Sequence, residues 1–325
     1  MLLLLFFSGL LIGDVVLSDG EQIDFSHINS RVILETNVRW TSPYNDESPE
    51  IDSSEHGVTP GKIETTCNCG KANRQTARIV GGKEYRQFEY PFLAAVSYST
   101  RPLSPHCGSV IVSYRHILTA AHCTEKAVNG VSLFVTLAEH DRGRTPGAYT
   151  IPVEQFIQHE GYNPKTLKND ISLLILKNQI IPSSSVQPAC MPKAGLDITG
   201  QYIKVVGWGA DRFQGPMKAR PQKVNLRVIP TDFCHKLWPD NVTKKPVLQI
   251  CTMSKKRTTC QGDSGGPVVW LDPDTNRYTA VGVVSAGPRC TDDRPTVHTS
   301  IVSYLEWIMK NIEASSPGQK LCTKL

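Results

Sequence analysis

A chain of 325 residues is long enough to bury a full hydrophobic core, and 40% apolar with 20% charged residues is ordinary for a globular protein. A net charge of +5 is small for this length, so the composition gives no reason to expect a nucleic-acid or membrane partner. We interpret the short basic run Lys255–Arg257 as a solvated loop.

The first predicted element is a secretory signal peptide over residues 1–18. An apolar run from Leu2 to Ile12 is followed by small and polar residues, although no Lys or Arg precedes it. Such a run is too short to span a bilayer, which takes about 20 apolar residues, and it fits a signal cleaved near Ser18. No later stretch is long enough to span, so we expect a secreted, extracellular protein.

A polar segment follows over residues 19–66. It contains no cysteine and is rich in Pro, Ser, Asp and Glu, most clearly in SPYNDESPEIDSSEHGVTPG. A segment of this composition buries too little apolar surface to offset its ordering entropy, so we expect it to be mostly disordered. Residues 31–40, RVILETNVRW, could dock as one strand.

From Ile79 onward the sequence predicts an all-β domain. Short runs rich in Val and Ile alternate with turn residues, as in SVIVS, VSLFVTL, ISLLIL, YIKVVGWG and YTAVGVVS. Helical periodicity is limited to the end of the chain, where Ile301, Leu305, Ile308 and Ile312 share one face.

The interpretation of the ten cysteines depends on the predicted export of the protein. An even number in an oxidising compartment indicates disulfides, whereas in the cytosol Cys67, Cys69 and the nearby histidines would suggest zinc. Asn241-Val242-Thr243 is the single N-x-S/T sequon, so Asn241 is the candidate glycosylation site.

Three residues carry the candidate chemistry. Ser264 lies in GDSGGP, His122 in LTAAHC and Asp170 in NDISLL. A serine hydroxyl is a weak nucleophile that needs a base, and the base needs a third group to fix its tautomer. GDSGG also has the G-x-S-x-G spelling of an α/β-hydrolase esterase, but the order His, Asp, Ser and the β-rich surroundings disfavour that alternative.

These motifs give the chain a clear resemblance to the trypsin-like, or chymotrypsin-fold, serine proteases. The matching stretches, in the order of that family, are RIVGG from Arg78, LTAAHC, NDISLL, GWG from Gly207, GDSGGP and VVSAG from Val283. The resemblance implies two packed six-stranded Greek-key β-barrels with a C-terminal α-helix. It also implies a propeptide or light segment over residues 19–78, a protease domain over 79–315 and a tail over 316–325.

The resemblance assigns roles to individual residues. It makes His122 the general base, Asp170 its orienting partner and Ser264 the nucleophile, with the N–H groups of Gly262 and Ser264 as the oxyanion hole. Cleavage after Arg78 would free the amine of Ile79 to pair with Asp263. An unpaired buried carboxylate is costly, so we expect the uncut chain to be a zymogen with an incomplete oxyanion hole.

The resemblance also implies disulfide pairings. These are Cys107–Cys123, Cys234–Cys251, Cys260–Cys290 and a tether between Cys69 and Cys190. Cys67 and Cys322 are left over, and they bond either to each other or to another chain.

The substrate pocket departs from the trypsin pattern. By the resemblance it is formed by Thr258, Ser285, Gly287 and Thr296, and Thr258 stands where trypsin-like members carry Asp. A cationic side chain would be unpaired there, and the β-branched Thr296 narrows the slot, so we expect small or medium apolar residues before the scissile bond. The alternative is a preference for Lys or Arg, because Asp292 and Asp293 near the pocket rim in sequence could restore negative charge.

Partners and cofactors follow from the same resemblance. The partners are protein or peptide substrates, an activating protease other than the enzyme itself, and serine-protease inhibitors. No cofactor or metal is expected, because Glu139 matches one calcium ligand of the family while Arg142, Arg144 and Pro146 occupy the rest of that loop. The light segment, with the CxCG sequence that contains the tethering Cys69, is similar to that of secreted arthropod digestive, salivary, haemolymph or venom proteases. The alternative function is a catalytically silent homologue that binds partners in a proteolytic cascade.

Overall fold

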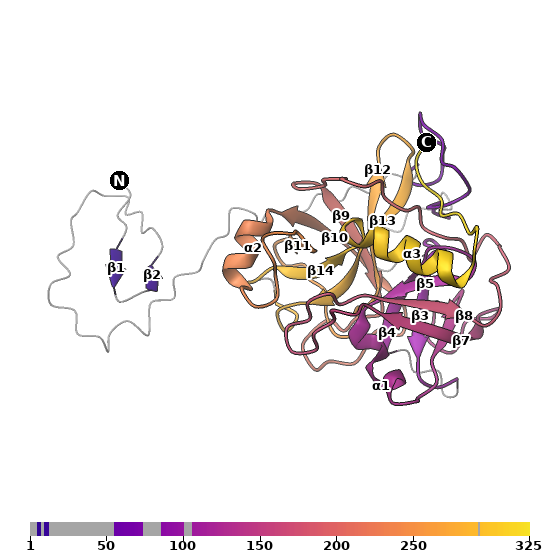
Figure 1. Ribbon diagram of the computed structural model, residues 1–325, viewed down its shortest axis with the longest axis horizontal. Coiled ribbons are helices and arrows are strands. Elements are labelled where there is room, and N and C mark those ends of the chain that lie inside the picture. Colours follow the sequence, from indigo (N-terminus) through magenta and orange to yellow (C-terminus); the bar gives the residue numbers. More distant parts are fainter. Residues whose placement is uncertain (1–4, 8–9, 13–54, 74–85, 101–105, 292) are drawn as a thin grey trace. The chain divides into compact units, whose positions relative to one another are not determined.

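The computed structural model describes residues 5–7, 10–12, 55–73, 86–100, 106–291 and 293–325 (Figure 1). The chain divides into two units, Met1–Thr41 and Ser42–Leu325. In the first unit, β1 (Leu5–Phe7) pairs antiparallel with β2 (Leu10–Ile12), within the stretch interpreted as a signal peptide. No helix in the described ranges is long and apolar enough to cross a membrane.

Six strands of the second unit form a closed antiparallel barrel in the order β3-β4-β5-β8-β7-β6. The expected runs SVIVS, VSLFVTL and ISLLIL fall in or beside β4, β6 and β8, and every residue of β8 is buried. The strands are β3 (Leu93–Ser97), β4 (Cys107–Ile111), β5 (His116–Thr119), β6 (Phe134–Leu137), β7 (Tyr149–Gln158) and β8 (Ser172–Leu176).

A second closed barrel has the order β10-β11-β14-β13-β12-β9. Its strands are β9 (Tyr202–Gly207), β10 (Gln222–Ile229), β11 (Gln249–Met253), β12 (Pro267–Asp272), β13 (Arg277–Ala286) and β14 (Thr296–Ser300). The two closed six-stranded barrels confirm the predicted fold class.

Helices are few and short. α3 (Leu305–Ser315) follows the 3-10 turn η2 (Val302–Tyr304), and the predicted apolar face is buried, with Ile308 0% and Ile312 1% exposed. Two helices were not predicted from the sequence: α1 (Glu125–Val128), after the 3-10 turn η1 (Ala121–Thr124), and α2 (Thr231–Leu237). Helices this short lack the several turns from which a periodic apolar face can be recognised.

Residues 55–73, the described part of the predicted light segment, pack against the hairpin of β12 and β13. Gly61 N–H donates to Thr275 O at 3.0 Å, and the Arg277 guanidinium donates to Thr59 O at 2.7 Å. The tail bonds to the same segment, because Leu325 N–H donates to Glu64 O at 3.0 Å. Part of the segment that composition predicts to be mostly disordered is therefore docked, whereas residues 31–40 lie outside the described ranges.

The two barrels share one apolar cluster, which contains Phe92 and Leu118 from the first barrel and Val206 and Val283 from the second. Backbone hydrogen bonds join the barrels directly, because Gly108 N–H at the start of β4 donates to Ser264 O at 2.8 Å. Since apolar packing fixes the barrels against each other, loops from both can contribute to one site with defined geometry.

Candidate active site

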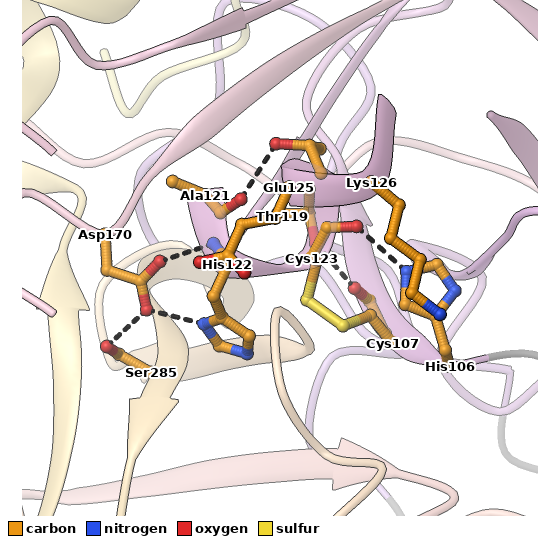
Figure 2. The surroundings of a disulfide bond; sticks show 12 residues. His106, Cys107, Thr119, Ala121, His122, Cys123, Glu125, Lys126, Asp170 and Ser285 are labelled. Carbon is orange, nitrogen blue, oxygen red and sulfur yellow. Dashed lines mark hydrogen bonds and ion pairs between the residues drawn. A yellow bond between two sulfur atoms is a disulfide. The ribbon is translucent and has the colours of Figure 1, made fainter. Parts of the chain in front are cut away.

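His122 and Asp170 are brought together by the pairing of β5 and β8. Thr119 and Ser172 are direct antiparallel partners, so the turn after β5 and the residues before β8 lie at the same end of the barrel. His122 Nδ1 lies 2.8 Å from Asp170 Oδ2, and the His122 backbone N–H donates to Asp170 Oδ1 at 2.9 Å (Figure 2). The carboxylate therefore holds both the imidazole and the backbone of the same histidine.

The Asp170 carboxylate is shielded from water, and both of its oxygens accept hydrogen bonds. The Asp170 side chain is 0% exposed, and Oδ2 also accepts the Ser285 hydroxyl at 2.6 Å. Its backbone carbonyl accepts the Thr299 hydroxyl at 2.8 Å. Because a carboxylate only accepts, the proton of a neutral His122 lies on Nδ1, and Nε2 keeps its lone pair.

Two opposing effects act on the His122 imidazole. Burial alone would lower its pKa, but the hydrogen bond and the negative charge of Asp170 outweigh burial and raise the pKa above the ordinary value of 6.5. A histidine with this environment is a stronger base than a free imidazole and still titrates in an accessible range.

Ser264 lies on a loop that inserts against the first barrel. Its carbonyl accepts the Gly108 N–H, and the next residue, Gly265, donates its N–H to Val284 O at 2.7 Å. Gly265 has φ +72°, and a Cβ there would collide with the Thr119 hydroxyl. Glycine thus allows the loop to approach the strand that precedes His122, and the Ser264 hydroxyl makes no hydrogen bond to any described residue.

The backbone around Ser264 presents unpaired donors. Gly262 has φ +96°, a conformation that L side chains rarely adopt, and a Cβ there would lie 2.6 Å from Met217 Cε. Within the described part of the chain, no acceptor pairs with the N–H of Gly262 or of Ser264. Two such neighbouring donors can stabilise a developing oxyanion.

The Asp263 carboxylate lies between the GWG stretch and the start of its own loop. It accepts the N–H of Gly209 at 2.8 Å and of Cys260 at 3.0 Å, and a Cβ at Gly207 or Gly209 would collide with it. Burial of the carboxylate raises its pKa from 3.8 to about 6, more than these N–H groups lower it. No cation from the described residues contacts it, and Arg78 and Ile79 lie outside those residues.

Three of the four predicted pocket residues, Thr258, Gly287 and Thr296, lie together, whereas the Ser285 hydroxyl bonds to Asp170. Thr258 Oγ1 is 3.1 Å from Thr296 Oγ1, and Thr296 is 2% exposed. A Cβ built on Gly287 would lie 3.5 Å from Thr296 Cγ2 and 3.8 Å from Thr259 Oγ1. The wall at Gly287 and the wall at Thr296 are therefore close together. Asp292 lies outside the described residues, and Asp293 accepts a hydrogen bond from the Thr291 hydroxyl.

Five disulfides connect the described cysteines, and no cysteine among them is free. The pairs are Cys107–Cys123, Cys234–Cys251, Cys260–Cys290, Cys69–Cys190 and Cys67–Cys322. The last pair is the intramolecular one of the two alternatives left open by the sequence. It joins residues 255 positions apart and fixes the tail to the light segment.

Hydrogen bonds engage Glu139, which matches one calcium ligand of the family, and Asn241, the predicted glycosylation site. The Glu139 carboxylate accepts the N–H groups of His140 and Gly143, each at 3.0 Å. Within the described residues, the group with metal-ligand spacing is His122 with Cys107 and Cys123, whose sulfurs are already in a disulfide. The Asn241 amide donates to Thr166 O at 2.8 Å, and its glycosylation stays a prediction.

Sequence patterns did not predict the contacts of three residues: Thr259 and Thr299, which contact site residues, and His298, which lies on the same strand as Thr299. His298 is fully buried, its Nε2 lies 2.8 Å from Thr252 Oγ1, and burial lowers its pKa to about 3, so the ring is neutral. Strand alternation is the available signal, because β14 places Thr296 and His298 on one face and Thr299 on the other. Which residues pack against each face of β14, however, depends on how the barrel closes.

The comparisons with known proteins agree with this geometry. The family model named Trypsin matches residues 79–308. The Venom serine protease of Polistes dominula is 32% identical over 254 residues, which cover 75% of this chain and 88% of the relative. Venom serine protease 34 of Apis mellifera is 33% identical over 270 residues, covering 80% of this chain and 64% of the relative. Serine protease 56 of Homo sapiens is 30% identical over 277 residues, covering 84% and 45%.

The chain thus spans less than half of the human relative and less than two thirds of the Apis mellifera relative. The family match covers both barrels and contains His122, Asp170 and Ser264. On the fold, the site and these similarities together, the chain belongs to the trypsin family of serine proteases.

Proposed function

We propose that this chain is a secreted serine endopeptidase that hydrolyses peptide bonds through His122, Asp170 and Ser264. The observation that carries the proposal is the hydrogen bond of 2.8 Å between His122 Nδ1 and the fully buried Asp170. It leaves the Nε2 lone pair available, as general-base catalysis requires. The loop of Ser264 approaches Thr119, three residues before His122.

The proposed chemistry has two acyl-transfer steps. His122 Nε2 takes the proton of the Ser264 hydroxyl as its oxygen attacks the scissile carbonyl, and Asp170 stabilises the imidazolium. The N–H groups of Gly262 and Ser264 stabilise the oxyanion. His122 then gives its proton to the leaving amine. Water, deprotonated by the same nitrogen, attacks the acyl-enzyme and regenerates Ser264.

The enzyme is made as a zymogen that is activated by cleavage after Arg78. Asp263 supports this part of the proposal, because its enclosed carboxylate carries a raised pKa of about 6 and no cationic partner from the described residues. The amine freed at Ile79 would supply that partner. Pairing would stabilise the loop of Gly262 and Ser264 and complete the oxyanion hole.

Substrate preference is set by the narrow pocket. A Cβ built on Gly287 would lie in van der Waals contact with Thr296 Cγ2 at 3.5 Å, so the Thr296 side chain faces Gly287 and occupies part of the slot between the two walls. Small or medium apolar residues before the scissile bond are therefore preferred. Thr258 offers no negative charge for Lys or Arg, so a protease of different specificity must cut after Arg78.

Export of the protein is supported by the five disulfides, which form and persist in oxidising compartments, and by the apolar start of the chain. Two of the relatives described above are named venom serine proteases. The alternative, a silent homologue acting as a binding protein, is disfavoured because such a protein has no need of the complete set His122, Asp170 and Ser264.

The test uses the full chain. Limited trypsin digestion, with sequencing of the new Ile79 terminus and removal of trypsin, should yield a protein that hydrolyses peptides with Ala or Val before the scissile bond. The Ser264→Ala variant, cut in the same way, should be inactive, and Arg78→Gln should resist both cutting and activation. A cut wild-type protein with no more activity than cut Ser264→Ala would favour the silent binding protein.

A further inference from the structure

A cluster of three side chains, Tyr98, His106 and Lys126, lies beside the site without a role in the hydrolysis proposed above. Tyr98 follows β3, His106 precedes β4 and Lys126 belongs to α1. Figure 2 shows Asp170 and Ser285 on one side of His122, and the Cys107–Cys123 disulfide with His106 and Lys126 on the other. The cluster therefore lies on the side of the histidine away from the substrate pocket.

Tyr98 and His106 form a fixed aromatic platform. Their rings stack with centroids 4.1 Å apart and an interplanar angle of 12°. The Tyr98 hydroxyl and His106 Nε2 each bond to Cys123 O at 2.8 Å, so both rings are anchored to the backbone of the residue that follows His122. Burial lowers the pKa of His106, which keeps its ring neutral near pH 7. The platform thus adds surface but no charge.

The charge of the cluster comes from Lys126. Its Nζ lies 5.5 Å from the Tyr98 ring centroid, its side chain is exposed, and it has no carboxylate partner within the described ranges. The neighbouring Glu125 faces a different group, because its carboxylate accepts the Tyr162 hydroxyl at 2.7 Å. Among the described residues, Lys126 is therefore a cation without a carboxylate contact, held over the Tyr98 ring.

The mechanism indicates which part of a substrate would contact this cluster. His122 must give its proton to the leaving amine, so the peptide after the scissile bond lies near Nε2 and away from Ser285 and the pocket. The Gly108–Ser264 hydrogen bond places the start of β4, and with it His106 and Cys107, beside the nucleophile on that side. The leaving segment of a substrate would thus pass the disulfide and reach the platform.

We propose that Tyr98, His106 and Lys126 form a subsite that selects an acidic side chain at the first or second residue after the scissile bond. The methylene groups of a Glu side chain would pack on the platform while its carboxylate pairs with the Lys126 ammonium. This inference rests on the proposed peptidase function, and it adds a preference on the leaving side to the narrow pocket on the acyl side.

The experiment uses the protein cut at Arg78 and quenched fluorescent peptides that share one sequence before the scissile bond. The two residues after the bond are varied together as Glu, Gln or Lys. At low salt, kcat/KM should be about tenfold higher for Glu than for Lys, with Gln between them, as expected for an exposed charge pair replaced by repulsion. The difference should shrink at about 0.5 M salt, because exposed charges are screened.

Variants separate the subsite from general charge effects. Lys126→Gln should remove the preference, and Lys126→Glu should reverse it. Lys310→Glu, which changes an exposed lysine of α3, makes the same change in net charge and should leave the order of the substrates unchanged.

The outcomes distinguish this inference from the function on which it rests. If the cut protein cleaves none of the peptides, the peptidase proposal is wrong. If it cleaves the Glu, Gln and Lys peptides equally, or if Lys126→Glu keeps the wild-type order, the acidic subsite is overturned while the peptidase stands.

Discussion

The Ser285 hydroxyl lies 2.6 Å from Asp170 Oδ2, the same oxygen that pairs with His122 Nδ1. Ser285 is thus a second anchor of the buried carboxylate as well as a predicted pocket residue. Hydrogen bonds to a charged group contribute about 1.5–3 kcal/mol, so Ser285→Ala should lower kcat by about ten- to hundredfold in the cut protein.

Peptide hydrolysis under saturating substrate measures this loss. Ser303→Ala is a matched control, because that hydroxyl bonds to Val247 O at 2.7 Å, away from the candidate site. Equal kcat values for Ser285→Ala and wild type would show that the Asp170 position does not depend on this hydroxyl.

The pH dependence of activity should follow His122. Because Asp170 raises the pKa of His122 above 6.5, the base is protonated and inactive below that pKa, and kcat/KM should fall as the pH drops through it. Asp170→Asn loses the charge and favours the wrong tautomer, so activity should drop by about 10³- to 10⁴-fold. A rate profile of the cut wild type between pH 5 and 9 checks this. An acid limb well below pH 6 would contradict the assignment of His122 as base.

Asp263 should make the stability of the uncut protein depend on pH. Its folded pKa of about 6 exceeds the unfolded value of 3.8, so the folded state binds more protons between these values and stability falls as pH rises through about 6. At neutral pH, Asp263→Asn should therefore stabilise the uncut protein by on the order of 2 kcal/mol, allowing for one lost N–H acceptor.

In the cut protein the same substitution should have the opposite sign, because it removes the partner of the Ile79 amine. Urea unfolding of the uncut and cut forms of both proteins at pH 7.5 gives the comparison. An Asp263→Asn effect of the same sign in both forms would argue against pairing with the new terminus.

The pocket predicts how specificity can be changed. Thr258→Asp should raise cleavage after Lys and Arg, since it places a carboxylate at the base, whereas Thr296→Gly should admit larger apolar residues by separating the walls. Cleavage of a library varied at the residue before the scissile bond measures both effects. Wild-type protein that already cleaves chiefly after Lys or Arg would refute the proposed pocket.

Two disulfides should retain the light segment after activation. Cys69–Cys190 and Cys67–Cys322 both connect residues before Arg78 to residues after it. The cut protein should migrate as one band without reductant and as two with it. Variants in which either pair is replaced by serine should keep the single band, and the variant lacking both pairs should separate under denaturing conditions. Separation in the variant lacking Cys67 and Cys322 alone would contradict the Cys69–Cys190 bridge.

Much of the fold was accessible from sequence because its signals are local. Short Val- and Ile-rich runs mark the strands, and the spacing of Ile308 and Ile312 marks α3. Local patterns cannot show which strand faces meet after barrel closure, so the contacts of Thr299 and His298 were missed. The docking of residues 55–66 was missed for a similar reason. Composition predicts little burial for this segment. It carries no information about contacts with distant residues, such as the neighbouring disulfides or the hydrogen bond from Arg277, more than 200 positions away, to Thr59 O.

The most direct test of the central claim is the rate at which a fluorophosphonate labels Ser264. The cut protein should be labelled at Ser264, mapped by peptide mass spectrometry, much faster than the uncut protein, and Asp170→Asn should slow labelling by orders of magnitude. Equal labelling rates before and after cleavage at Arg78, or label found on a residue other than Ser264, would contradict the account.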